Sequence, residues 1–143
     1  MMRGTSAALA GVLLIAFSAE SGSLPIDYTH VGRAGVARMM GQWVRYIVPI
    51  DDSPCITIQL FKAANMEGLI HQKEICSLGN KQFHSDFTYV AINKVEPGID
   101  HVRLEISFIP LRSGTDDVRD CSIAIRNGFI GDLECPLEHS SDH

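Results

Sequence analysis

Apolar and polar residues alternate with a period of two in the chain from residue 43 onward. The clearest case is His101–Pro110, where Val102, Leu104, Ile106 and Phe108 occupy every second position. This period places the apolar side chains on one face of a β-strand and the intervening residues on the other. We therefore expect His101–Pro110 to be a strand with one buried and one solvent-facing side.

Six further runs of similar character are separated by turn residues. They are Trp43–Pro49, Cys55–Lys62, Leu69–Cys76, Phe87–Val95, Cys121–Arg126 and Phe129–Cys135. Together with His101–Pro110 they make seven short strands. The pattern predicts an all-β, antiparallel fold, either a two-layer, immunoglobulin-like sandwich or a small barrel.

The N-terminal part of the chain has a different character. Residues 1–19 combine Arg3 with an apolar run that is shorter than the roughly 20 residues of a membrane span. This pattern predicts a cleaved signal peptide, a secreted extracellular or periplasmic product and no transmembrane segment. We expect an N-terminal segment at 20–42 with a short helix near Val31–Met40, one β domain at 43–136, and a flexible tail at 137–143.

Export would place all four cysteines in an oxidising compartment, where disulfides persist. The four are Cys55, Cys76, Cys121 and Cys135. Their wide spacing is not that of a zinc site, so we expect neither a metal nor another cofactor. Spacing alone allows three pairings, and only the strand register can select one of them.

The register around Asn127-Gly128 favours a Cys121–Cys135 disulfide. If Ile123 lies opposite Leu133, Ser122 faces Glu134 and the two cysteines face each other. That alignment predicts a three-residue connection, Asn127–Phe129. A two-residue loop would instead place Ile123 opposite the charged Asp132.

A second hairpin favours a Cys55–Cys76 disulfide. If Ala64 faces Glu67 across a turn, Ile56 lies opposite Ile75 and the two cysteines come within bridging distance. Each disulfide would then close its own local hairpin, and each would add about 3 kcal/mol of stability on loop-closure grounds.

The composition and motifs argue against several classes of function. The formal net charge is −5 and no basic run is present, so no nucleic-acid partner is expected. The residue types of a hydrolytic triad occur together in His84-Ser85-Asp86, but adjacent strand positions point to opposite faces. No other catalytic motif is found, so we assign no catalytic residue and expect a protein that is not an enzyme.

Two acidic doublets in predicted loops are a weaker candidate. Asp51-Asp52 and Asp116-Asp117 would bind calcium only if the two loops met at one end of the fold. Solvated acidic loops are the simpler interpretation.

The hairpin tip Asn127-Gly128-Phe129-Ile130 is the candidate partner-binding site. A rigid loop that exposes an aromatic side chain is typical of a recognition site. The alternative is that Phe129 folds back to close the end of the sandwich. The sequence thus predicts an exported, disulfide-stabilised binding protein that engages a protein partner through loops or a sheet edge.

Two other functions remain open from the sequence. One is a small secreted hydrolase without a recognisable motif. The other is a carrier that holds a lipid or another apolar ligand between two sheets. The side chains that would line its cavity are Leu104, Ile106, Phe108, Ile123 and Ile125.

Overall fold

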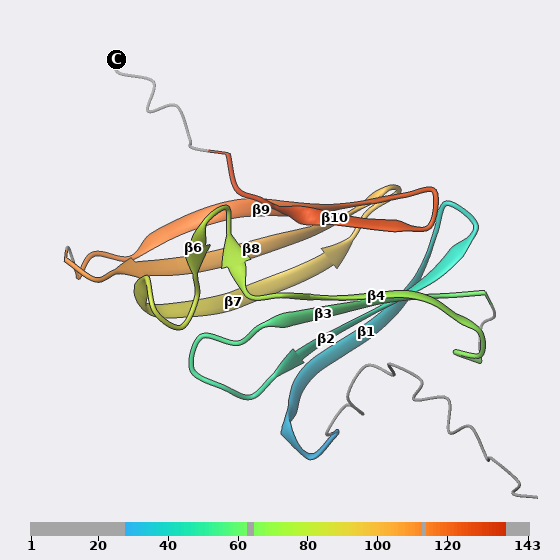
Figure 1. Ribbon diagram of the computed structural model, residues 1–143, viewed down its shortest axis with the longest axis horizontal. Coiled ribbons are helices and arrows are strands. Elements are labelled where there is room, and N and C mark those ends of the chain that lie inside the picture. The colour runs from blue at the N-terminus through green and yellow to red at the C-terminus, as the bar shows by residue number, and fades with distance from the viewer. Residues whose placement is uncertain (1–27, 63–64, 113, 137–143) are drawn as a thin grey trace, which may run out of the picture.

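The computed structural model describes residues 28–62, 65–112 and 114–136, and these form two antiparallel four-stranded sheets packed face to face (Figure 1). The first sheet contains β1 (Val31–Met39), β2 (Gln42–Pro49), β3 (Ile56–Phe61) and β4 (Leu69–Ile75). The second contains β7 (Phe87–Pro97), β8 (His101–Pro110), β9 (Asp117–Arg126) and β10 (Phe129–Glu134). A short ribbon of β5 (Ser77–Leu78) and β6 (Lys81–Gln82) connects them, and a 3₁₀ turn, η1 (Tyr28–His30), precedes β1.

The predicted all-β sandwich and its seven strands are confirmed, and the described sheets do not close into a barrel. Strands that follow one another along the chain are neighbours in each sheet, in the orders β1-β2-β3-β4 and β10-β9-β8-β7. Each layer is therefore a meander, in contrast to the Greek-key connections of immunoglobulin domains.

The predicted helix near Val31–Met40 is wrong, because this segment is strand β1. It pairs with β2 from Val31 opposite Pro49 to Met39 opposite Gln42. The ring of Tyr46 lies against Gly35 and fills the space that a Cβ atom on residue 35 would need. Glycine also lowers helix propensity, so pairing with β2 decides the local structure.

The β structure therefore begins at Val31, well before residue 43. The predicted signal peptide (1–19) and the predicted tail (137–143) lie outside the described residues. Within the described residues, no helix has both the length and the apolar character needed to cross a membrane.

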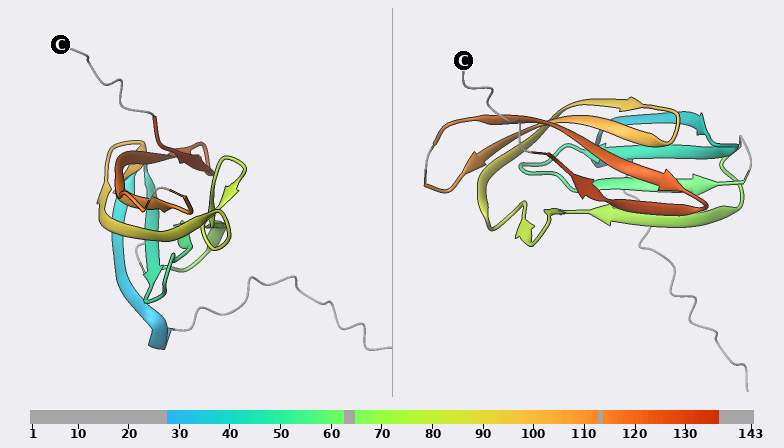
Figure 2. Two further views of the ribbon diagram at one scale, coloured as in Figure 1. Left: turned by 90° about the vertical axis from the view of Figure 1, so that its left-hand side faces the viewer. Right: turned by 90° about the horizontal axis from the view of Figure 1, so that it is seen from above.

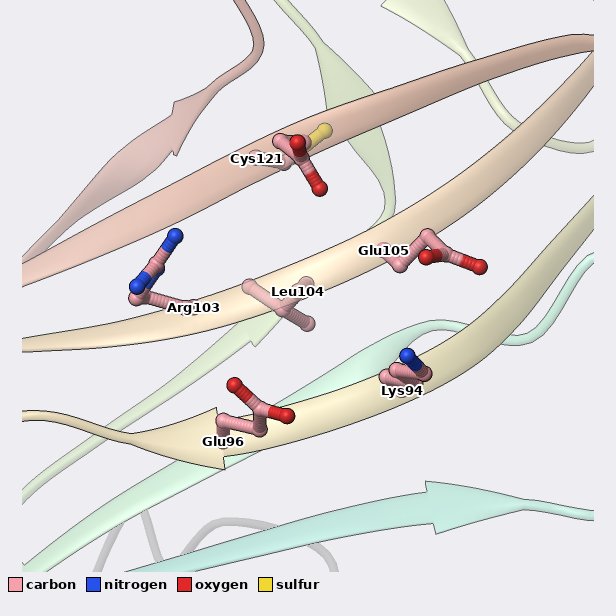
Figure 3. A pocket seen from close by; sticks show the side chains of 7 residues that line it. Lys94, Glu96, Arg103, Leu104, Glu105 and Cys121 are labelled. Carbon is pink, nitrogen blue, oxygen red and sulfur yellow. The ribbon is translucent and has the colours of Figure 1, made fainter.

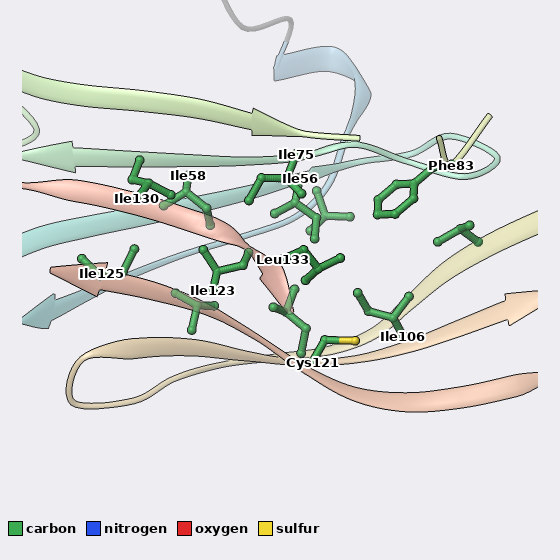
Figure 4. Close-up of a cluster of buried hydrophobic side chains, with 14 of the residues drawn as sticks. Ile56, Ile58, Ile75, Phe83, Ile106, Cys121, Ile123, Ile125, Ile130 and Leu133 are labelled. Atoms are coloured by element: carbon green, nitrogen blue, oxygen red, sulfur yellow. The ribbon is translucent and has the colours of Figure 1, made fainter. Parts of the chain in front are cut away.

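One hydrophobic cluster fills the space between the sheets (Figure 4). Phe83, from the turn after β6, is fully buried and packs edge-on against Phe108, with their ring centroids 6.1 Å apart. The five side chains proposed to line a ligand cavity all belong to this cluster, and each is at most 2% exposed. They are packed core residues in this structure.

Candidate functional site

The candidate site begins with the turn that joins β9 to β10. Arg126 pairs with Phe129, so only Asn127 and Gly128 form the connection. Both have positive φ angles, 50° and 77°, as a two-residue type I′ hairpin requires. The predicted three-residue connection is therefore wrong.

A β-bulge restores the predicted alignment further along the hairpin. The register shifts between Ile130 and Leu133, after which Leu133 lies opposite Ile123 and Glu134 opposite Ser122. The bulge inserts one extra residue into β10 and leaves Asp132 exposed. The hairpin thus combines the tight turn with the predicted core pairing, without burying the charge.

Lys73 of β4, in the opposite sheet, holds this bulge in place. Its Nζ donates to the carbonyl oxygens of Ile130 (3.5 Å) and Gly131 (3.2 Å) and to Asp132 Oδ1 (2.6 Å). The Lys73 hydrogen bond lowers the pKa of Asp132 below its ordinary value, and the lysine charge adds to this. Sequence reasoning missed this role. The sequence does contain a signal for this contact. Lys73 stands two positions before Ile75, so the two side chains lie on the same face of the strand.

Both predicted disulfides are present. Cys55–Cys76 joins the ends of the β3–β4 hairpin, with a Cα–Cα distance of 4.5 Å. Cys121–Cys135 joins the interior of β9 to the residue that follows β10, where the pairing of these two strands ends, with a Cα–Cα distance of 4.2 Å. Ile56 lies opposite Ile75, as predicted, while Ala64 and its expected partner across the turn fall partly outside the described residues. The Phe129 hairpin is thus closed covalently at the end away from its turn.

Of the two apolar residues at the hairpin tip, one lies on the surface and the other lies in the core. Phe129 is 71% exposed, whereas Ile130 is 5% exposed and belongs to the hydrophobic cluster. Phe129 has an edge-on contact with the ring of His71, at 6.1 Å between centroids. Phe129 therefore does not fold back into the core, and His71 supports it from β4.

The β1–β2, β7–β8 and β9–β10 turns and the start of β4 lie at the same end of the sandwich (Figure 2). Three of the exposed apolar side chains on these segments accompany Phe129. They are Met40 (68% exposed), Ile70 (40%) and Ile99 (79%). A Cβ atom on Gly128 would lie 3.9 Å from Ile70 Cγ2, so this end of β4 touches the hairpin turn. We call Met40, Ile70, Ile99 and Phe129 the loop-end patch.

An open cleft of about 460 Å³ lies beside the turn of the hairpin. It is lined by Met40, Gln42, Asp100, Ile125, Arg126 and Asn127. Asp100 accepts a hydrogen bond from the Ile125 N–H through its backbone carbonyl (2.8 Å), and its carboxylate contacts His101 Nδ1 (2.8 Å). The hydrogen bond to His101 lowers the pKa of Asp100. The cleft therefore offers both apolar and charged groups next to the loop-end patch.

The His84-Ser85-Asp86 sequence lies in the turn between β6 and β7, not on a strand as predicted. The Asp86 carboxylate accepts a hydrogen bond from the Gln82 N–H (2.6 Å), and so it stabilises that turn. His84 Nε2 lies 3.7 Å from Cys55 Sγ. The hydrogen bond thus gives Asp86 a structural role in the turn.

The two acidic doublets do not form a metal-binding cluster in the described structure. Asp117 is the first residue of β9 and forms a salt bridge with Arg119 (2.7 Å). In the described ranges, the grouping with metal-ligating side chains is Cys55, Glu74 and Cys76, whose two sulfurs are joined to each other.

The outer face of the second sheet carries a shallow depression of about 100 Å³ (Figure 3). Lys94 lies opposite Glu105 and Glu96 opposite Arg103 on β7 and β8. These cross-strand pairs are of opposite charge, whereas Glu105 also lies opposite the acidic Asp120 of β9, which lines the same depression. This face has the character of an ordinary solvated surface.

Comparison of the chain with protein-family models, with curated proteins and with solved structures finds no match. We therefore infer the function from the residues of this chain alone.

Proposed function

We propose that this chain is an exported, disulfide-stabilised binding protein that engages a protein partner through the loop-end patch. The observation that carries the proposal is the exposure of Phe129 on a hairpin that is held rigid by the Cys121–Cys135 disulfide and by Lys73. An aromatic side chain on a fixed support loses little conformational entropy when a partner covers it.

The loop-end patch surrounds this anchor with further apolar area. Met40, Ile70 and Ile99 come from three separate parts of the chain, and the fold brings the segments that carry them to one end of the sandwich (Figure 2). Burial of a single phenylalanine ring is worth about 1.5–3 kcal/mol, and the neighbouring side chains exclude water from such a contact. Export is supported by the two disulfides, which are typical of oxidising compartments.

Capture experiments with single variants test this proposal. We expect Phe129→Asp to abolish retention of a partner from the extracellular or periplasmic fluid of the source organism, without lowering the melting temperature. Leu111→Asp is the matched control, because Leu111 is 60% exposed and belongs to the loop after β8. This loop lies at the other end of the sandwich (Figure 1).

Quantitative binding gives the second part of the test. With the captured partner purified, we expect Phe129→Ala to weaken binding by at least about tenfold, which corresponds to the lost burial of the ring. Equal capture by the Phe129→Asp and Leu111→Asp variants would refute the loop-end patch as the contact.

A further inference from the structure

The outer edge of β1 is the longest regular sheet edge among the described strands. From Arg33 to Met39, β1 pairs with β2 without a register shift and contains no proline. By contrast, β7 has register shifts after Phe87 and Ile92, and it ends in Pro97. Bulges and prolines of this kind protect sheet edges from pairing, and this part of β1 lacks both.

The other two sheet edges are shorter or occupied. The β10 edge is interrupted by its bulge, and β4 is linked to β10 through Lys73. Among the described residues, no strand pairs with β1 on the side away from β2. Within the described part of the chain, the outer side of β1 is therefore the regular sheet edge with which an added strand could pair.

The register shows which backbone groups this edge presents. Met40 and Gly41 have positive φ angles and form a two-residue turn, so Met39 and Gln42 are the hydrogen-bonded pair that closes it. Bonded pairs alternate along an antiparallel ladder. The N–H and C=O groups of Ala34, Val36 and Arg38 consequently point away from β2.

The positive charge of the segment around β1 favours an acidic partner. Residues 28–50 contain Arg33, Arg38 and Arg45 and no acidic residue, although the whole chain has a net charge of −5. Arg33 donates to the carbonyl of Asn93 on β7 (3.0 Å), while Arg38 is exposed on the outer face beside Val36. A second copy of β1 would bring like charges together, whereas acidic side chains would be attracted.

A groove beside the edge offers space for apolar side chains. This groove has a volume of about 260 Å³ and runs between the start of β1 and β7. Its lining includes the apolar groups of Ile50, Tyr89 and Ile92, together with the charged side chains of Arg33 and Asp51. An added strand alternates its side chains, so one set can face the groove while the other faces the solvent side near Arg38.

We propose that the outer edge of β1 binds an extended, acidic segment of a partner protein by strand addition. The backbone groups of Ala34, Val36 and Arg38 form the ladder, and Arg38 attracts the acidic side chains. This surface is separate from the loop-end patch, and the inference does not depend on that patch.

Two synthetic probes test the proposal with the full chain. One is a nine-residue peptide of alternating valine and glutamate, and the other has lysine in place of each glutamate. We expect the glutamate peptide to bind at least about tenfold more tightly at low salt, because exposed charge pairs lose strength as salt is added. Binding should also slow hydrogen exchange at Val36.

Three variants locate the site. Val36→Pro removes an outward-pointing N–H, which an edge strand tolerates, and Arg38→Glu reverses the local charge. We expect each to weaken binding of the glutamate peptide by about tenfold. Arg112→Glu makes the same charge change on the loop after β8 and should leave binding within about twofold.

Several results would overturn the inference. These are failure of the glutamate peptide to bind, equal binding of the lysine peptide, and unchanged binding by both β1 variants. Self-association of the unmodified chain that Val36→Pro abolishes would show that a second copy occupies the edge. Loss of peptide binding in Phe129→Asp but not in Val36→Pro would place the site at the loop-end patch, against this inference and in favour of the proposed function.

Discussion

Lys73 connects the two sheets at the point where β10 departs from regular pairing. A bulge leaves backbone carbonyls without strand partners, and such groups need another donor. The Lys73 ammonium reaches two of these carbonyls and the Asp132 carboxylate from the opposite sheet. The lysine is therefore oriented by the bulge, and the bulge is stabilised by the lysine.

The ion pair between Lys73 and Asp132 makes the hairpin sensitive to acid. The folded-state pKa of Asp132 is lowered, so the carboxylate stabilises the fold above its unfolded pKa near 3.8. This contribution is lost as the pH falls through the still lower folded pKa. We expect Asp132→Asn to lower the urea midpoint at about pH 6 and to have a smaller effect at about pH 2.5.

A matched variant distinguishes this effect from a general loss of charge. Asp116→Asn removes an aspartate from the exposed loop before β9 and should show no such difference between the two pH values. An equal change of the Asp132→Asn midpoint at both pH values would contradict the role of the ion pair.

The β9–β10 hairpin depends on a turn that few residues can adopt. Gly128 has a φ of +77°, where a side chain is strained, so we expect Gly128→Ala to cost about 1 kcal/mol of unfolding free energy. Asn127→Gly relieves a positive φ at the neighbouring position and should change stability by less than about 0.5 kcal/mol. Urea denaturation measures both, and equal costs would show that the turn geometry does not limit the hairpin.

The sequence predicts those strands in which apolar and polar residues alternate strongly. The strand β1, which it does not predict, lacks this alternation. His101–Pro110 alternates large apolar residues with polar ones, and β8 has these same bounds. In β1, the small residues Gly32, Ala34, Gly35 and Ala37 occupy both faces, so no period is visible. That strand is defined by pairing with β2, which depends on contacts beyond its own sequence.

Part of the candidate site is likewise predictable from the sequence, and part of it is not. Alternation and turn residues predict the disulfides and the exposed hairpin tip, because these depend on local register. The bulge is not predicted, since a three-residue loop aligns Ile123 with Leu133 equally well. Met40, Ile70 and Ile99 lie far apart in the sequence, and only the folded chain brings the segments that carry them to one end of the sandwich (Figure 2).

At the scale of the molecule, neither disulfide joins one sheet to the other. Cys55–Cys76 lies within the first sheet and Cys121–Cys135 within the second. The sheets are held together by the hydrophobic cluster and by hydrogen bonds such as that from the Val90 N–H to Ser53 Oγ (2.9 Å). The disulfides therefore stabilise the hairpins, while the core stabilises the sandwich.

Because each disulfide lies within one sheet and the core joins the two sheets, we expect the sandwich to survive the loss of either disulfide. Replacement of Cys55 and Cys76, or of Cys121 and Cys135, by alanine should each lower the unfolding free energy by about 3 kcal/mol, because each opens a short loop. Since the core is intact, both variants should still unfold in one cooperative urea transition and retain slow hydrogen exchange at Ile106 and Ile58. Separate unfolding of the two sheets, or loss of exchange protection in the core without denaturant, would show that the disulfides hold the layers together.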